Sequence, residues 1–263
     1  MSDGVYFYGL VPAAAPSPPA DLAGMADVRV ELIAVGPVQA AVSRVPAAQY
    51  RPKLIEARLD DLTWVGEQGI AHERVVLWFV DHAEILPARL FSMYADDAAL
   101  MAALEPQSAR IEHAFEQLGG RREWNLKVAY DAAELGRHGG EVSEELRRLD
   151  AEIEDAPPGR RYLMQRKRAD LLKQEVAHAA NRLADELLAA LATHADRVRT
   201  LPLAEADEAG TVMLNAALLV TREAEPELRR HAESLHDEHA RLGMIISFSG
   251  PWAPYRFLED HAV

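Results

Sequence analysis

The stretch that decides the fold is LLKQEVAHAANRLADELLAAL, residues 171–191. Apolar residues recur in it at intervals of three and four, which places them on one face of an α-helix. They are Leu172, Val176, Ala179, Leu183, Leu187 and Leu191. We expect the helix to run from Arg160, after the PPG of residues 157–159, to about Ala195. At 1.5 Å per residue it would be about 50 Å long, which is longer than a small domain.

Strands and further helices flank this helix. The predicted segments, in order, are a strand at 124–130, an amphipathic helix at 141–153, the long helix, a hairpin of 197–203 and 211–220 joined by the acidic turn AEADEAG, a helix from Pro226 to about Leu242, and a strand at 244–249. The order βα(α)ββαβ is the split βαβ of ferredoxin-like folds, with an enlarged helical first crossover.

The first half of the chain also mixes strands and helices. We predict a strand at 5–11, a hairpin of 28–35 and 38–45 around Gly36-Pro37, a helix from Pro52 to about Ile70, and a helical region at 96–118 that ends at Gly119-Gly120. The run VVLWFV at 75–80 is ambiguous between a buried strand and the end of a helix. The prediction is an α+β protein with two domains, an α+β domain at 1–120 and a ferredoxin-like domain at 121–263.

Composition excludes several classes of function. The 263 residues carry a net charge of -14, which argues against nonspecific binding to nucleic acid or to an anionic membrane surface. The chain has no cysteine, so disulfides, iron-sulfur clusters and thiolate zinc sites are excluded. No run of about 18 uncharged apolar residues occurs, so we expect no membrane insertion and a cytoplasmic protein. An RNA-binding module of the RRM type needs aromatic residues on its central strands, and Thr211 to Val220 has none.

The end of the chain, SFSGPWAPYRF at 247–257, sets aromatic residues between prolines. The prolines forbid an ordinary helix, so we expect an extended, irregular segment. Trp252, Tyr255 and Phe257 carry large apolar surfaces that either pack across the domain junction or bind a partner. We favour the packing role, with Trp252 mostly buried.

A dense positive cluster lies at the start of the long helix, and its members are Arg160, Arg161, Arg166, Lys167 and Arg168. Acidic residues of the preceding helix offer ion pairs to it, and those residues are Glu144, Glu145, Glu152, Glu154 and Asp155. We favour such exposed ion pairs. The alternative is contact with an acidic patch on a partner.

Arg89 lies alone among apolar residues, after Pro87 and before Leu90. Such an arginine must extend to solvent, form an ion pair or meet a partner. We expect an ion pair that fixes the fold, in preference to a contact with another protein.

Catalytic and metal-binding motifs are weak. Phosphate-binding loops of the form GxxxxGK[ST] or GxGxxG and the GxSxG elbow are absent. His236 and His239 have the wrong spacing for a HExxH metal site, and His239 falls on an apolar stripe that predicts partial burial. His72 and Glu73 are adjacent, so we expect their side chains to point to different faces of a helix. We therefore predict no catalytic residue, no cofactor and no metal.

Motifs along nearly the whole chain resemble the gas vesicle protein GvpL/GvpF family. They are GVYFYGLVP (4–12), DLTWVGEQGIAHERVV (61–76), ILPARLFSMY (85–94), EWNLKV (123–128), GRRYLMQRKR (159–168) and SGPWAPYRF (249–257). One departure is Phe91, where the family usually has glycine.

The resemblance implies an accessory or minor structural protein of gas vesicle formation rather than an enzyme. Its implied partners are the gas vesicle shell protein and other gas vesicle proteins, in the cytoplasm and in association with the vesicles. The candidate structural or partner contacts are Arg89, Trp124, Arg161, Arg166, Lys167, Arg168, Trp252 and Tyr255. The alternative function is a small-molecule or metal-dependent enzyme with a ferredoxin-like domain, which would need polar groups that converge in a pocket.

Overall fold

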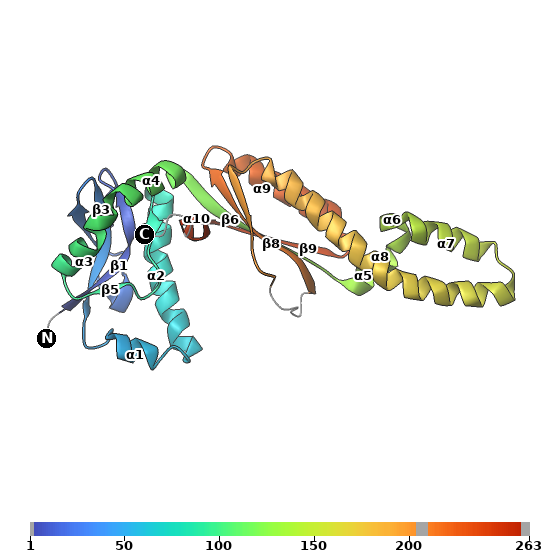
Figure 1. Cartoon of the computed structure of the whole chain (residues 1–263), viewed down its shortest axis with the longest axis horizontal. Helices are drawn as coiled ribbons and strands as arrows, with labels where there is room; N and C mark the ends of the chain where they lie inside the picture. The colour runs from blue at the N-terminus through green and yellow to red at the C-terminus, as the bar shows by residue number, and fades with distance from the viewer. Residues whose placement is uncertain (1–2, 204–209, 259–263) are drawn as a thin grey trace. The chain divides into compact units, whose positions relative to one another are not determined.

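A computed structural model describes residues 3–203 and 210–258 of the chain (Figure 1). These residues form two compact units, 3–123 together with 251–258, and 124–250. The sequence-based ranges differ from this grouping at the end of the chain, because 251–258 pack with the first unit. Most of the predicted acidic turn, residues 204–209, lies outside the described residues.

The first unit is built on an antiparallel sheet in the order β2-β3-β1-β4, and β5 also pairs with β1. Its strands are β1 (Asp3–Pro12), β2 (Glu31–Val35), β3 (Val38–Pro46), β4 (Leu86–Pro87) and β5 (Met93–Tyr94). Val35 pairs with Val38, so Gly36 and Pro37 form a two-residue turn. Gly36 adopts a φ of 57°, which glycine reaches without steric cost. The predicted hairpin is confirmed.

A β-bulge in β1 decides which side chains face which side of this sheet. The pairing with β3 shifts between Phe7 and Gly9, so Tyr8 is the additional residue. Tyr8 and Val11 therefore lie in the same core cluster although they are three residues apart. At Gly9 the backbone has a φ of 151°, and a Cβ there would lie 2.4 Å from the carbonyl oxygen of Leu86. Glycine is required at this position because β4 approaches so closely.

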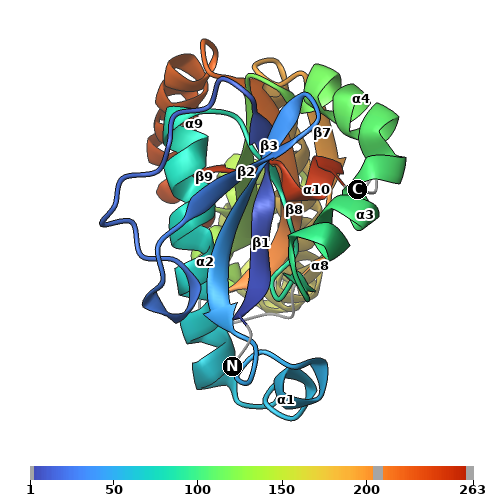
Figure 2. The same cartoon turned by 90° about the vertical axis from the view of Figure 1, so that its left-hand side faces the viewer.

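Helices cover both faces of the first sheet (Figure 2). They are the 3-10 turns η1 (Met25–Asp27) and η2 (Glu105–Gln107) and the α-helices α1 (Pro52–Glu56), α2 (Leu62–His82), α3 (Asp97–Leu104), α4 (Ser108–Leu118) and α10 (Tyr255–Leu258). Figure 2 shows α2 on one side of the sheet and α3, α4 and α10 on the other. Asp61 caps α2, because its carboxylate accepts the backbone N–H of Trp64 at 3.1 Å.

The ambiguous run VVLWFV lies within α2, and its residues Val75, Val76, Phe79 and Val80 are buried. They pack against Tyr6 and other buried residues of the sheet. The run is therefore a buried segment of a long helix and not a strand.

The second unit has a four-stranded sheet in the order β7-β8-β6-β9. Its strands are β6 (Arg121–Tyr130), β7 (Arg197–Thr200), β8 (Thr211–Thr221) and β9 (Met244–Trp252), of which Arg121–Glu123 and Pro251–Trp252 group with the first unit. Its helices are α5 (Ala132–Arg137), α6 (Gly139–Val142), α7 (Glu144–Glu154), α8 (Pro158–Ala192) and α9 (Glu225–Ala240). The predicted helix at 141–153 is thus interrupted at Ser143, whose hydroxyl caps α7 by accepting the N–H of Leu146.

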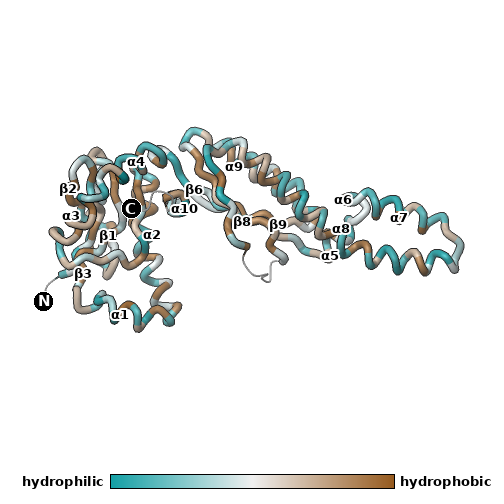
Figure 3. The backbone as a smooth tube through the Cα atoms, in the orientation of Figure 1, coloured by the Kyte–Doolittle hydropathy of each residue, from teal (hydrophilic) through white to brown (hydrophobic). Residues whose placement is uncertain are grey.

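The predicted apolar stripe of the long helix is the face that α8 buries. Val176, Ala179, Leu183, Leu187 and Leu191 are all buried in one cluster with residues of β6, β8, β9 and α9. Figure 3 shows the matching apolar colour along β8 and β9. At roughly 1.5–3 kcal/mol for each large apolar side chain, this face stabilises the unit strongly.

Each unit therefore combines helices with an antiparallel sheet, and the predicted α+β class holds at this level. Within the part of the chain that the structure describes, no helix is both long enough and apolar enough to cross a membrane.

Candidate functional site

The C-terminal segment packs into the first unit, and its most deeply buried aromatic residue is Phe257. Strand β9 continues to Trp252, and one helical turn, α10, follows it. Ala253 and Phe257 are buried, with 0% and 1% of their surface exposed, whereas Trp252 is only partly buried. The expectation of an extended, irregular segment therefore fails at residues 255–258, which form a helical turn. Phe257 and Tyr255 fix the segment.

The hydroxyl of Tyr255 connects this segment to α2. It donates a hydrogen bond to Oε1 of Glu73 at 2.7 Å and lies 3.1 Å from Nε2 of His72. His72 and Glu73 were expected to point to different faces of a helix, and one hydroxyl group nevertheless reaches both side chains. Nothing in the local sequence of α2 indicates this, since the partner lies more than 180 residues away.

The hydrogen bonds form a chain with one consistent direction. The Tyr6 hydroxyl accepts the backbone N–H of Phe91 at 3.1 Å and therefore donates to Nδ1 of His72 at 2.8 Å. His72 then carries its proton on Nε2 and donates it to Tyr255, which donates to Glu73. We call Tyr6, His72, Tyr255 and Glu73 the buried relay.

Burial sets the protonation states in the relay. It lowers the pKa of His72 to about 4, and the backbone of Ala88 has a smaller effect that raises this pKa. It also raises the pKa values of Tyr6, Tyr255 and Glu73. At neutral pH the imidazole is neutral and both phenols are protonated, so Glu73 is the one group of the relay that can carry a charge there.

An ion pair with a buried carboxylate adds a second attachment for the same segment. Glu123 is fully buried, accepts the backbone N–H of Arg256 at 3.0 Å, and forms an ion pair with the Arg256 guanidinium, whose side chain is 40% exposed. Removing Arg256 leaves the charge of the buried Glu123 uncompensated, at a cost below the roughly 3 to 5 kcal/mol of a fully buried pair. The sequence analysis did not predict this pair.

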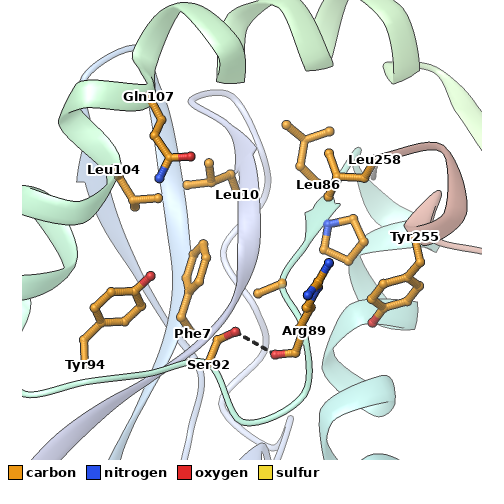
Figure 4. Close-up of a pocket in the computed structure, with 12 residues that line it drawn as sticks. Phe7, Leu10, Leu86, Arg89, Ser92, Tyr94, Leu104, Gln107, Tyr255 and Leu258 are labelled. Atoms are coloured by element: carbon orange, nitrogen blue, oxygen red, sulfur yellow. Dashed lines mark hydrogen bonds between the residues drawn. The ribbon is translucent and has the colours of Figure 1, made fainter. Parts of the chain in front are cut away.

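A pocket of about 390 Å³ lies on the other face of β1, beside α10 (Figure 4). Phe7 and Leu10 line it from the sheet, and Leu104 and Leu258 from the helices. Figure 4 shows Tyr255 and Arg89 on one side of it. The site thus combines an apolar wall with a guanidinium.

Arg89 forms no ion pair with the residues that the structure describes. Its side chain is exposed, and no ion pair connects it to a described residue. Its backbone carbonyl accepts the N–H of Ser92 at 3.2 Å and the Ser92 hydroxyl at 2.7 Å, so the turn of 89–92 is fixed by its backbone. The cation is consequently not needed to fix the fold.

Phe91, which departs from the family pattern, adopts the backbone conformation that glycine would. Its φ is 66°, in the left-handed region. The ring stacks on Trp64, with centroids 5.2 Å apart and planes within 8°. Stacking of this kind contributes about 0.5 to 1.5 kcal/mol, which offsets the strain of the backbone.

The positive cluster at the start of α8 is only partly neutralised. Arg168 forms a bidentate pair with Asp150, which the sequence analysis did not name, and one of its bonds is 3.0 Å long. Arg161 donates to the carbonyls of Ile153, Glu154 and Ala156 at the end of α7. The remaining cations are exposed and pair with no described residue, and these cations are Arg160, Arg166 and Lys167. Most of the predicted ion pairs therefore do not form.

Trp124 is buried in the second unit and stacks on Phe248, with ring centroids 4.8 Å apart. Its indole N–H is buried and has no acceptor among the described residues. The ring lines a second pocket, of about 600 Å³, together with His236.

Residues suited to metal binding do not gather within the described part of the chain, where no cluster of three such side chains occurs. His239 is partly buried, as predicted, and its Nδ1 lies 2.9 Å from the carbonyl oxygen of Leu235.

Two solved structures with a similar fold are those of gas vesicle proteins. The crystal structure of GvpF from Anabaena sp. aligns over 97% of this chain and 96% of its own, with a TM-score of 0.66 and 20% identity. GvpF from Microcystis aeruginosa aligns over 97% and 98%, with a TM-score of 0.64 and 18% identity. These structures define the fold.

Sequence comparison identifies the family. The model of the family described as "Gas vesicle synthesis protein GvpL/GvpF" matches residues 4–259, and the chain belongs to this family. Gas vesicle protein L of a Streptomyces species is 28% identical over 229 residues, which cover 86% of this chain and 82% of the relative. Gas vesicle protein L2 of Halobacterium salinarum is 26% identical over 270 residues, which cover 99% and 93%.

Proposed function

We propose that this chain is an accessory or minor structural protein of gas vesicle formation that acts by binding other gas vesicle proteins. The role in vesicle formation rests on the family, whose relatives of both the L and the F kind are gas vesicle proteins. The proposed partners are the vesicle shell protein and the other accessory proteins, with the chain associated with the vesicle. Catalytic turnover is not part of the proposal.

The observation that carries the contact mechanism is an exposed surface at the start of α8. Tyr162 and Leu163 expose 69% and 66% of their surface. Arg166 follows Tyr162 by four residues and Lys167 follows Leu163 by four, so each cation lies on the same side of the helix as its apolar neighbour. We call these residues the α8 surface. A partner that covers it gains about 25 cal/mol for each Å² of apolar area removed from water.

The experiment is complementation of a vesicle-forming host from which the gene has been deleted. We expect the wild-type chain to restore buoyancy and to copurify with the shell protein or another gas vesicle protein. The variant Tyr162→Ser with Leu163→Ser should do neither, at an unchanged melting temperature, because these side chains contribute little to the core. The matched control is Val198→Ser, an apolar residue of the same unit that is 39% exposed. It should behave as wild type.

Normal vesicles in the deletion host, with no related gene to substitute, would contradict the role in vesicle formation. Full complementation by the Tyr162→Ser, Leu163→Ser variant would contradict the α8 surface alone.

We also propose that the two units are domains and that the second is ferredoxin-like, with a boundary near Gly119-Gly120. The strand order β7-β8-β6-β9 supports this, since a ferredoxin-like sheet places its first strand beside its third and fourth. Both α8 and α9 contribute to one core cluster, as the two crossover helices of that fold do. An experimental structure with α8 and α9 on opposite faces of the sheet would contradict it.

A further inference from the structure

The pocket beside α10 has an apolar wall and few free polar groups. Phe7, Leu10, Leu86, Leu104 and Leu258 are among its lining residues. Its volume of about 390 Å³ falls within the range of sites that bind ligands. An apolar group that enters this space is favoured by the removal of its surface from water.

The polar groups around the pocket are mostly engaged within the chain. The Ser92 hydroxyl donates to the carbonyl of Arg89, and the Gln107 amide donates to the carbonyl of Ala103 at 2.9 Å. The Tyr255 hydroxyl donates to Glu73. A ligand rich in hydroxyl or amide groups would therefore leave several of them unpaired, which disfavours sugars and nucleotides.

The guanidinium of Arg89 and the hydroxyl of Tyr94 are exceptions among the described residues, and of the two only the guanidinium is charged. Other arginines of the same unit are paired, Arg44 with Asp97 at 2.8 Å and Arg256 with Glu123. Arg89 pairs with no described residue, and none of the residues that line the pocket is acidic. A carboxylate brought to the pocket would meet a planar, bidentate donor without a competing anion.

We propose that this pocket binds a peptide segment of another protein in which a leucine-sized or aromatic side chain stands next to a glutamate or aspartate. The apolar side chain enters the pocket between β1 and α10, and the neighbouring carboxylate pairs with Arg89. The proposal rests on the proposed function in one respect, that the partner is a protein.

The test is a titration of the full chain, labelled at leucine methyl groups, with the peptide acetyl-Gly-Leu-Glu-Leu-Gly-amide, followed by NMR. We expect shifts of leucine methyls that line the pocket, and binding at least about tenfold weaker when glutamine replaces the glutamate of the peptide. Arg89→Met should remove this preference. The matched control is Arg51→Met, an exposed arginine of the same unit that does not line the pocket.

A charge exchange makes the test independent of any loss of structure. Arg89→Glu should bind acetyl-Gly-Leu-Lys-Leu-Gly-amide in preference to the glutamate peptide, because the sign of the charge at the pocket is reversed. A folded variant without this reversal would overturn the assignment of Arg89.

Other outcomes would also overturn the proposal. They are equal binding of the glutamate and glutamine peptides, equal effects of the Arg51 and Arg89 variants, and no shift at about 10 mM peptide. Binding of free 4-methylpentanoate as tight as that of the peptide would indicate that the ligand of the pocket is a small carboxylic acid and not a peptide. A tenfold gain in affinity for the glutamate peptide in the double variant Glu259→Gln, Asp260→Asn would assign the site to the chain's own carboxylates. None of these results bears on vesicle formation, which the deletion host tests separately.

Discussion

The hydroxyl of Tyr255 is one of the groups that attach the C-terminal segment to the first unit, and Tyr255→Phe removes it while keeping the ring. The change deletes the hydrogen bond to Glu73 and the contact with Nε2 of His72. Oε2 of Glu73 already has no partner among the described residues, so the carboxylate would lose the hydrogen bond that its Oε1 accepts from Tyr255. Two buried polar groups are thus left unpaired without a change in packing volume.

The size of the effect follows from these groups. An unpaired buried donor or acceptor costs about 1 to 3 kcal/mol. The imidazole of His72 keeps the hydrogen bond from Tyr6 at 2.8 Å, and Glu73 as a residue is only partly buried. Both costs therefore lie near the lower limit, and we expect a loss of about 2 kcal/mol in the free energy of unfolding of the first unit.

Hydrogen-deuterium exchange of the β1 amides, read by mass spectrometry, measures this free energy in the first unit separately from the second. A loss of 2 kcal/mol should accelerate their exchange about thirtyfold. Tyr162→Phe, which removes an exposed hydroxyl from the other unit, should leave the exchange of β1 unchanged. Exchange of β1 in Tyr255→Phe within about threefold of wild type would refute the reasoning.

Three further changes test the same unit. The folded-state pKa of His72 is lowered from 6.5 to about 4, so its contribution to the free energy of unfolding is complete above pH 6.5 and falls by about 3 kcal/mol as the pH falls toward 4. Urea unfolding should show this loss in a Glu73→Gln background, which removes the opposite pH dependence of the Glu73 carboxyl, and His72→Gln should abolish it. Phe91→Ala should be less stable than Phe91→Gly by about 1 kcal/mol in the same assay, because alanine keeps the left-handed strain that glycine relieves; the reverse order would contradict the strain. Phe257→Ala should cost about 3 to 5 kcal/mol and Trp252→Ala less, because only the first ring is fully buried; equal melting temperatures of the two variants would contradict this assignment of the anchor.

Local patterns were sufficient where structure depends on neighbours in the sequence. The apolar stripe of α8 appears in the sequence because residues three and four apart share a helix face. The hairpin of β2 and β3 appears because Gly36 marks its turn. In α2 the periodicity was lost, since VVLWFV is buried on most sides and a continuous apolar run fits a strand equally well.

The candidate site could not be predicted in the same way because its members meet only through the tertiary fold. His72 and Tyr255 are distant in sequence, and each alone resembles an ordinary core residue. The interpretation of Arg89 failed for the opposite reason. Its apolar neighbours predicted burial and therefore a partner within the chain, whereas the turn of 89–92 leaves it exposed. A cue for Arg256 was present, since Glu123 and Arg256 each lie in a family motif.

The discontinuity of the first unit has a consequence for synthesis on the ribosome. Residues 124–250 emerge as one uninterrupted stretch and can fold as soon as they leave the exit tunnel. The first unit begins earlier yet waits for 251–258, because His72, Glu73 and Glu123 receive their partners only then. A ribosome that stalls before residue 251 would release a chain with a finished second unit and an open first one. Cellular proteases would thereby distinguish copies that contain residues 251–258 from copies that lack them.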